Sequence, residues 1–287
     1  MSTNKNTLLA IVGLSLMAAR RCMAPYAHAK SPQKFTQPQL LACLVLKTHT
    51  RSTYRGIIEL LEVSPPLRRA LGLGVRLPHY TTLQKFAAGE GVVAVLDAVL
   101  EQVVRSLNGG ERLQTEDVAV DATGMQAGIA SAHYQTRSGR GYTRWVRVSV
   151  VAICALVLPA AMEIDWGPGN DAKPAVAVLR KAARAVQPER QWGDRAYDSE
   201  RVHAFSHEEW GVRSYAPLIR RNGDGRVVRG RYRRRMRRQP RGYGRRWTVE
   251  SLISAIKRTT GSALTSRRDN TLKVEAALRV LTYAIRR

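Results

Sequence analysis

The feature that most constrains the fold is a change of pattern at Asn108-Gly109-Gly110. Asparagine and glycine favour turns, so this tripeptide is expected to end regular structure. Before it, apolar residues recur at helical spacing, and after it they alternate as in strands. A chain of 287 residues is long enough for two domains. We therefore expect a helical region over residues 1–110 and an α/β domain over residues 115–287.

The first region consists of apolar-periodic segments separated by Pro65-Pro66 and by residues 76–80. Its opening apolar run, residues 8–19, imitates a secretory signal. Two arginines follow that run directly, and it is too short to span a bilayer. We expect a buried first helix instead. The predicted helices are 7–20, 38–50, 53–62 and 92–107.

The second region begins with a strand pattern over residues 117–124, and residues 145–165 are long enough for two antiparallel strands. A helix over 172–186 follows, with Asn170 or Asp171 as its N-cap. The remaining predicted elements are strands at 190–193 and 211–218, and helices at 199–209, 247–260 and 271–286. This order predicts a mixed α/β fold, a sheet layered with helices.

The chain is strongly cationic, with a formal net charge of +25 and a pI of about 11.0. Such a charge favours a polyanionic partner, and nucleic acid is the natural one because bound phosphates release counterions. A membrane surface is disfavoured, since no basic amphipathic helix carries a bulky aromatic apolar face. Three scattered cysteines, Cys22, Cys43 and Cys154, indicate neither a disulfide framework nor a cysteine zinc site. They fit a reducing cytosol.

Residues 243–257 place one carboxylate at the edge of the most basic part of the chain. If the whole stretch is helical, Tyr243, Arg246, Glu250 and Lys257 share one polar stripe. Gly242 and Gly244 also allow Tyr243 to lie just before the helix. The simpler alternative is a solvated face stabilised by weak ion pairs. The predicted core face comprises Val249, Leu252, Ile256 and Ala263.

Two further acids are candidates to join Glu250. Asp121 lies near the centre of the strand pattern at 117–124, followed by small residues, and Asp194 ends the strand at 190–193. Three converging carboxylates in a basic protein suit Mg²⁺ or Mn²⁺, which prefer hard oxygen ligands. Two such ions about 4 Å apart can drive an in-line displacement. The alternatives are an ordinary polar strand residue at Asp121 and a loop or capping residue at Asp194.

Three motifs resemble those of the DDE-class insertion-sequence transposases of bacteria and archaea, over residues 25 to 287. They are VDATG at 120–124, GDRAYDS at 193–199, and the spacing of Tyr243, Arg246, Glu250 and Lys257. The resemblance implies a ribonuclease H-like fold, preceded here by a small helical domain for DNA-end binding or dimerisation. It implies strand nicking by water, followed by attack of the freed 3′-hydroxyl on target DNA.

The resemblance also implies roles. Asp121, Asp194 and Glu250 would be catalytic and hold two Mg²⁺ or Mn²⁺ ions, with their carboxylates within about 8 Å of one another. Arg246 and Lys257 would hold DNA phosphates, and Tyr243 would position DNA or the helix start. The partners implied are double-stranded DNA, at the element ends and the target, and a second copy in a homodimer, with no membrane. The expected location is cytoplasmic, at the nucleoid.

Residues 220–246 form an insertion with thirteen arginines and one acid, Asp224. We interpret this as a basic hairpin or loop that grips the DNA backbone, and the alternative is a disordered basic segment. Two other functions stay open: a catalytically silent DNA-binding protein derived from such an element, and an RNA-binding structural protein. The predicted DNA-binding residues of the insertion are Arg233, Arg234, Arg235, Arg237 and Arg238.

Overall fold

The computed structural model describes residues 6–28, 30, 32–126, 145–169, 172–220 and 228–287. The chain divides into two compact units. A helical unit comprises residues up to Val103 together with Ile256–Arg287, and a sheet unit comprises Val104–Ala255. Helix α10 (Trp247–Thr260) begins in the sheet unit and ends in the helical unit.

The helical unit is built around α2, whose residues from Leu40 to Leu46 are all buried. Thr36 and Gln39 form a capping box at the start of α2. Helix α1 buries Ile11, Val12 and Leu16, as expected for a packed first helix. The helices are α1 (Thr7–Cys22), α2 (Gln37–His49), α3 (Tyr54–Val63), α4 (Pro65–Ala70), α5 (Tyr80–Ala87), α6 (Val92–Ser106) and α11 (Asp269–Arg286).

Two features of this unit differ from the sequence-based expectation. Pro65-Pro66 does not interrupt structure but begins α4, because proline fits the first helical turn. Helix α11 contacts α1 and α2, so residues 256–287 group with the amino-terminal helices. The predicted boundary, with residues 115–287 as one domain, does not follow this grouping, since the buried face of α11 packs on distant parts of the chain.

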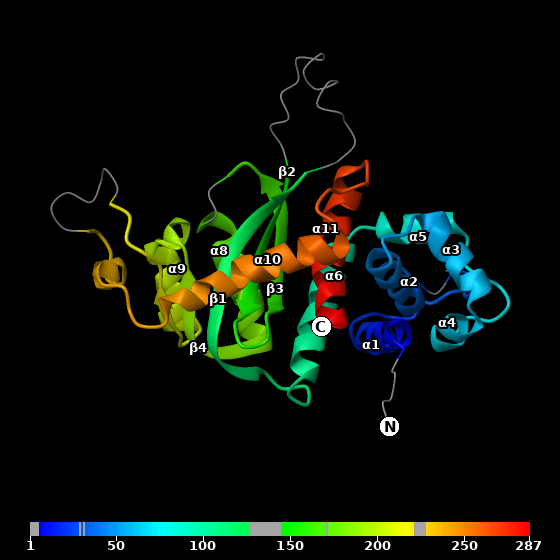
Figure 1. Cartoon of the computed structure of the whole chain (residues 1–287), viewed down its shortest axis with the longest axis horizontal. Coiled ribbons are helices and arrows are strands. Elements are labelled where there is room, and N and C mark those ends of the chain that lie inside the picture. Colours follow the sequence, from blue (N-terminus) through cyan, green and yellow to red (C-terminus); the bar gives the residue numbers. More distant parts are fainter. Residues whose placement is uncertain (1–5, 29, 31, 127–144, 170–171, 221–227) are drawn as a thin grey trace, which may run out of the picture. The chain divides into compact units, whose positions relative to one another are not determined.

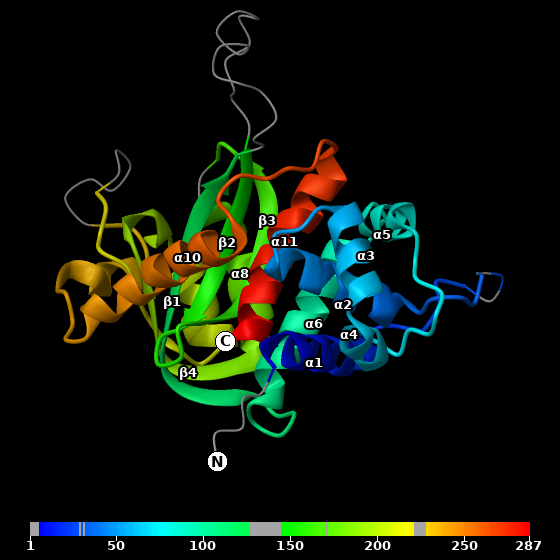
Figure 2. The same ribbon diagram turned by 45° about the vertical axis from the view of Figure 1, so that its right-hand side comes forward.

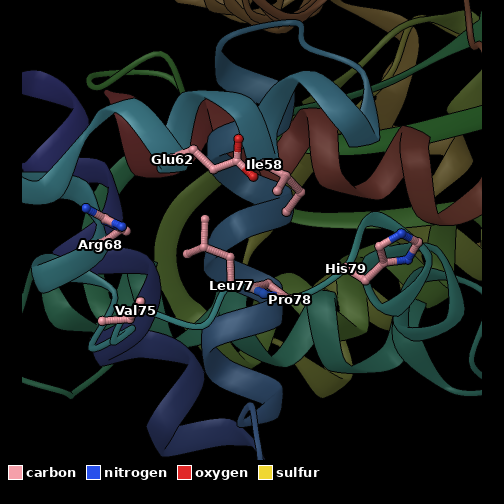
Figure 3. Close-up of a pocket in the computed structure, with 7 residues that line it drawn as sticks. All are labelled: Ile58, Glu62, Arg68, Val75, Leu77, Pro78 and His79. Atoms are coloured by element: carbon pink, nitrogen blue, oxygen red, sulfur yellow. The ribbon is translucent and has the colours of Figure 1, made fainter.

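A shallow pocket of about 350 Å³ opens on the helical unit between α3, α4 and the loop before α5 (Figure 3). None of the residues predicted for a functional site lines it. Among the described residues, no helix is long and apolar enough to cross a membrane. The pocket is lined by Ile58, Glu62, Arg68, Val75, Leu77, Pro78 and His79.

Among its described residues, the sheet unit contains five strands in the order β3-β2-β1-β4-β5. The first three pair antiparallel, while β4 and β5 run parallel to β1. Helix α8 (Ala172–Ala185) packs on β2 and β3 (Figures 1 and 2). This is the expected ribonuclease H-like fold. The strands are β1 (Leu113–Met125), β2 (Trp145–Ile153), β3 (Leu158–Gly167), β4 (Val186–Gly193) and β5 (Arg213–Tyr215).

The remaining elements connect the sheet to α10. The helix predicted over 199–209 is a short α9 (Glu200–Ala204) continued by one π-helical turn, Phe205–Glu209. Three 3₁₀ turns, Arg195–Tyr197, Arg233–Arg237 and Tyr243–Arg246, complete the unit. The predicted N-cap of α8, Asn170 or Asp171, lies outside the described residues.

Candidate active site

Asp121 and Asp194 are brought together by the pairing of the two central strands. The last paired residues of the parallel strands β1 and β4 are Val120 and Gly193. The next residue on each strand is an aspartate, and neighbouring strands lie about 4.8 Å apart. Asp121 therefore lies beside Asp194 at the carboxyl end of β4, the edge where α/β sheets usually bind ligands.

Backbone amides orient both carboxylates. The amide of Ala122 donates to Asp121 Oδ1 at 2.7 Å, and that of Ala196 donates to Asp194 Oδ1 at 2.8 Å. The second bond makes Asp194 the N-cap of the turn Arg195–Tyr197, so the capping role considered from sequence is present. Gly193 is needed here, because a Cβ at this position would lie 2.9 Å from that of Tyr197.

Negative charge gathers around Asp121. Burial raises the pKa of its carboxyl to about 6, against the stabilising hydrogen bond from Ala122. The charges of Asp194 and Glu250 raise this pKa further, which identifies them as the neighbouring acids. The three predicted carboxylates thus form one electrostatically interacting group, called here the acidic cluster: Asp121, Asp194 and Glu250.

Tyr243 lies in a 3₁₀ turn directly before α10, as the flanking glycines allowed. Gly242 adopts φ 91°, which suits glycine, and α10 begins at Trp247. The Tyr243 ring packs edge-on against Trp192 and Tyr215, with centroids 6.3 and 5.2 Å away. Its hydroxyl lies 3.5 Å from the carbonyl oxygen of Gly193. Tyr243 therefore docks the start of α10 onto the end of β4, one residue before Asp194.

Arg246 and Glu250 form an ion pair one turn apart on the helix, with Arg246 Nη1 2.5 Å from Glu250 Oε1. The Nε of Arg246 is buried and has no hydrogen-bond partner within the described part of the chain. On the other side of α10, Val249 and Leu252 are fully buried, as predicted, as is Ile256 in the helical unit. Ala263 was wrongly assigned to this core face, because α10 ends at Thr260 and Ala263 is exposed.

Lys257 lies two turns beyond Glu250 on α10, in the part of the helix that groups with the helical unit. Burial lowers the pKa of its ammonium group. Lys257 lies seven positions after Glu250, which is about two helical turns, so both lie on one face of the helix.

Two further aspartates, Asp117 and Asp198, have cationic partners of their own. Asp117 is buried and accepts hydrogen bonds from Arg190 Nε and Trp192 Nε1, each at 2.8 Å. Asp198 is fully buried and accepts from Arg233 Nε and Nη2, at 3.1 and 3.0 Å. These pairs stabilise the sheet unit.

Arg233 is therefore a correction to the predicted DNA-binding residues. Its side chain is buried, and Nη2 also donates to the carbonyl oxygen of Ile219 at 2.6 Å. A guanidinium held by an internal carboxylate cannot reach phosphate. The described part of the insertion, 228–246, is folded, whereas Asp224 lies outside the described residues. The other predicted arginines, Arg234, Arg235, Arg237 and Arg238, are exposed.

The acidic cluster fits a divalent cation in chemistry. It offers only carboxylate oxygens, the ligands that Mg²⁺ and Mn²⁺ prefer. Burial is the main cause of the raised pKa of Asp121 and the charges of Asp194 and Glu250 add to it, so a bound cation would favour the ionised form of this carboxyl. However, no three His, Cys, Asp or Glu side chains in the described segments form a ready-made metal site. Glu250 is held by Arg246 instead, and the separation of about 8 Å expected for shared metal ions stays a prediction.

Fold and site define an α/β protein of the ribonuclease H-like class with an acidic cluster at the end of its central parallel strands. A family model described as transposase DDE domain matches residues 112–285, more than half of the chain. The chain belongs to this family of DDE-domain transposases. No curated protein matches it. A solved structure, the cryo-EM piggyBac transposase synaptic complex with hairpin DNA, is similar with a TM-score of 0.45 and 7% identity, covering 98% of this chain and 72% of that chain.

The sequence did not reveal that the rings of Trp192 and Tyr215 pack against Tyr243. Trp192 is buried, and its contact with Tyr243 was not foreseen. The available signal was its position directly before Gly193-Asp194. The acids that hold the arginine-rich insertion, Asp198 among them, were also missed because their partners lie more than 20 residues away.

Proposed function

We propose that this protein is the transposase of an insertion element, and that it cleaves and joins DNA strands in a metal-dependent reaction. The observation that carries the proposal is the acidic cluster. Two aspartates follow directly on the last residues of the β1–β4 pairing, and burial, with the added charges of Asp194 and Glu250, raises the pKa of Asp121 to about 6. Burying neighbouring carboxylates destabilises the folded chain unless a bound cation neutralises their charge, so the cluster favours a cation site.

Asp121, Asp194 and Glu250 are proposed to hold two Mg²⁺ or Mn²⁺ ions. When bound, these ions would activate water and stabilise the leaving oxygen. Water then attacks a phosphodiester, the bond from phosphorus to the 3′-oxygen breaks, and that oxygen leaves as a 3′-hydroxyl. In the second step this hydroxyl attacks a phosphodiester of target DNA. The new bond to phosphorus joins the two strands, while the bond from that phosphorus to the target's own 3′-oxygen breaks and this oxygen leaves as a hydroxyl.

The side chains around the cluster orient these ligands and the DNA. Arg246 restrains Glu250 through their ion pair until the ligands assemble, and its positive charge is proposed to attract a DNA phosphate beside the site. Tyr243 fixes the start of α10 through its packing on Trp192 and Tyr215, so its role is to position Glu250 rather than to bind DNA. Lys257 is proposed to bind phosphate further along α10.

Two more proposals concern DNA. The exposed arginines Arg234, Arg235, Arg237 and Arg238 bind the phosphate backbone of the element ends or of the target, independently of sequence. The helical unit serves DNA-end recognition or the formation of a homodimer on DNA.

The test is a nicking assay on a plasmid that carries the DNA flanking this coding region, run with Mg²⁺, Mn²⁺ or a chelator. We expect nicking only with a divalent ion, and nearly complete loss in Glu250→Gln. This change preserves the side chain's shape and leaves the buried face of Val249 and Leu252 intact. DNA affinity should be kept or increase, since one negative charge is removed. Nicking by Glu250→Gln at the wild-type rate refutes the proposal, and wild-type binding without cleavage favours the catalytically silent alternative.

A further inference from the structure

The described part of the insertion is held in place by three acids from the segment that follows Asp194. Asp198 pairs with Arg233 through two hydrogen bonds in the protein interior. Although burial disfavours ionisation, the bonds from His203 and Arg233 hold the pKa of Asp198 below its usual value. Asp198 is thus ionised at neutral pH, and the pair is a full ion pair.

Glu200 and Glu208 hold the same segment at other points. The Glu200 carboxylate accepts hydrogen bonds from the backbone amides of Tyr232 and Arg233, at 3.0 and 3.1 Å. The Tyr232 hydroxyl donates to Glu208 Oε1 at 2.8 Å, and the Tyr232 ring stacks on His207 with centroids 4.7 Å apart. The segment therefore lies against α9 and its π-helical continuation (Figure 1).

Because the segment is held in this way, one of its arginines points into the protein and others point to solvent. Arg233 points inward to Asp198, while the other arginines on the same 3₁₀ turn are exposed. Two arginines also flank the Tyr232 ring, with Arg231 and Arg235 5.4 and 5.6 Å from its centroid. The outward set is Arg231, Arg234, Arg235, Arg237 and Arg238, and we call this set the arginine platform.

We propose that Asp198, Glu200 and Glu208 are positioning residues that fold residues 228–238 into a preformed platform for the phosphate backbone of duplex DNA. The proposal rests on the proposed function for its partner. A platform that is already folded loses less conformational entropy when DNA binds than a flexible basic loop does. Asp198 is only four residues from Asp194, so the platform is fixed relative to the acidic cluster.

The most informative variant is Asp198→Asn, because its change in net charge alone would strengthen DNA binding, whereas the proposed positioning role predicts weaker binding. Removing an acid makes the chain more cationic, which by itself strengthens DNA binding. The proposal predicts weaker binding, since Arg233 loses its partner and the platform unfolds. We expect the dissociation constant for a random-sequence duplex at fixed salt to rise at least about tenfold, and the slope of log K against log salt to fall by about two to three.

The control is Glu209→Gln, which removes the same charge from the surface. Glu209 is more than half exposed, and its ion pair with Arg180, at 2.9 Å, lies on the surface, where such pairs contribute little. Its loss should leave DNA affinity unchanged or slightly higher. Glu200→Gln should fall between the control and Asp198→Asn, because an amide oxygen still accepts from the amides of Tyr232 and Arg233.

Limited trypsin digestion reports the fold of the platform without DNA. In Asp198→Asn, cleavage after Arg234, Arg235, Arg237 and Arg238 should become faster, while circular dichroism of the whole chain stays near wild type. The double variant Asp198→Leu/Arg233→Met should restore slow cleavage, because it removes both buried charges.

Unchanged digestion and unchanged or tighter binding in Asp198→Asn overturn the inference. That result leaves the proposed function standing, which instead fails if the wild-type chain neither binds nor nicks duplex DNA.

Discussion

Asp121→Asn should stabilise the metal-free protein at neutral pH, although it removes a proposed catalytic group. The carboxyl has a pKa of 3.8 when solvated and about 6 in the folded chain, where burial is the main cause. Below pH 3.8 the group is protonated in both states and costs nothing. Above pH 6 it is ionised in both states, and the folded state carries the full penalty. Each pKa unit corresponds to about 1.4 kcal/mol, so this penalty is at most about 3 kcal/mol.

Asparagine keeps the shape of aspartate and its oxygen can still accept from the Ala122 amide. The variant should therefore gain up to about 3 kcal/mol of unfolding free energy at pH 7.5, and the gain should vanish as the pH falls from 6 towards 4. The assay is urea unfolding followed by tryptophan fluorescence, in a chelator, at both pH values. Millimolar Mg²⁺ should stabilise the wild type and have little effect on the variant, because a bound ligand stabilises only the state that binds it.

Asp117→Asn is the matched control on the same strand. Asp117 faces Arg190 and Trp192 rather than other acids, so its neutralisation should destabilise the protein by about 1–3 kcal/mol. Stability changes of opposite sign for two aspartates four residues apart would show that ionisation is unfavourable at Asp121 in particular. A loss of stability in Asp121→Asn at pH 7.5, or a gain that does not depend on pH, would contradict a raised pKa of Asp121 in the folded protein.

Three further predictions follow from the site. Replacing Arg234, Arg235, Arg237 and Arg238 with Ala should lower the slope of log K against log salt for duplex DNA by about three to four, whereas Arg233→Ala should mainly destabilise the protein. Tyr243→Phe should cost less than about 0.5 kcal/mol because the hydroxyl contact is long, while Tyr243→Ala should cost about 2 kcal/mol and slow cleavage more than it weakens DNA binding. Arg246→Ala should raise the DNA concentration needed for cleavage but leave partial cleavage at saturation, which a nicking titration measures.

The sequence predicted the strands from local pattern, whereas the catalytic role of the acids stays a prediction. Alternation marked β1, the length of residues 145–165 marked β2 and β3, and each aspartate of the cluster directly follows the last residue of the β1–β4 pairing. The position of Glu250 on a polar face of its helix, opposite the buried face, followed from helical spacing. These features are determined by residues that lie close together in the sequence.

The errors have a different origin. Arg233 could not be distinguished from its neighbours, because its burial depends on Asp198, which lies 35 residues earlier. Residues 256–287 could not be assigned to the helical unit, since the buried face of α11 finds its partners in α1 and α2. Pro65-Pro66 marks a helix start as readily as an end.

The most direct test of the central claim is the location of Mn²⁺ in crystals of the protein with duplex DNA, by anomalous diffraction. If the three carboxylates hold two metal ions, we expect two anomalous peaks about 4 Å apart, one of them contacting both Asp121 and Asp194 and the other contacting Glu250. Both peaks should disappear or weaken in Asp121→Asn. Anomalous density elsewhere in the chain with none at the acidic cluster would contradict the assignment of these three carboxylates as the catalytic site.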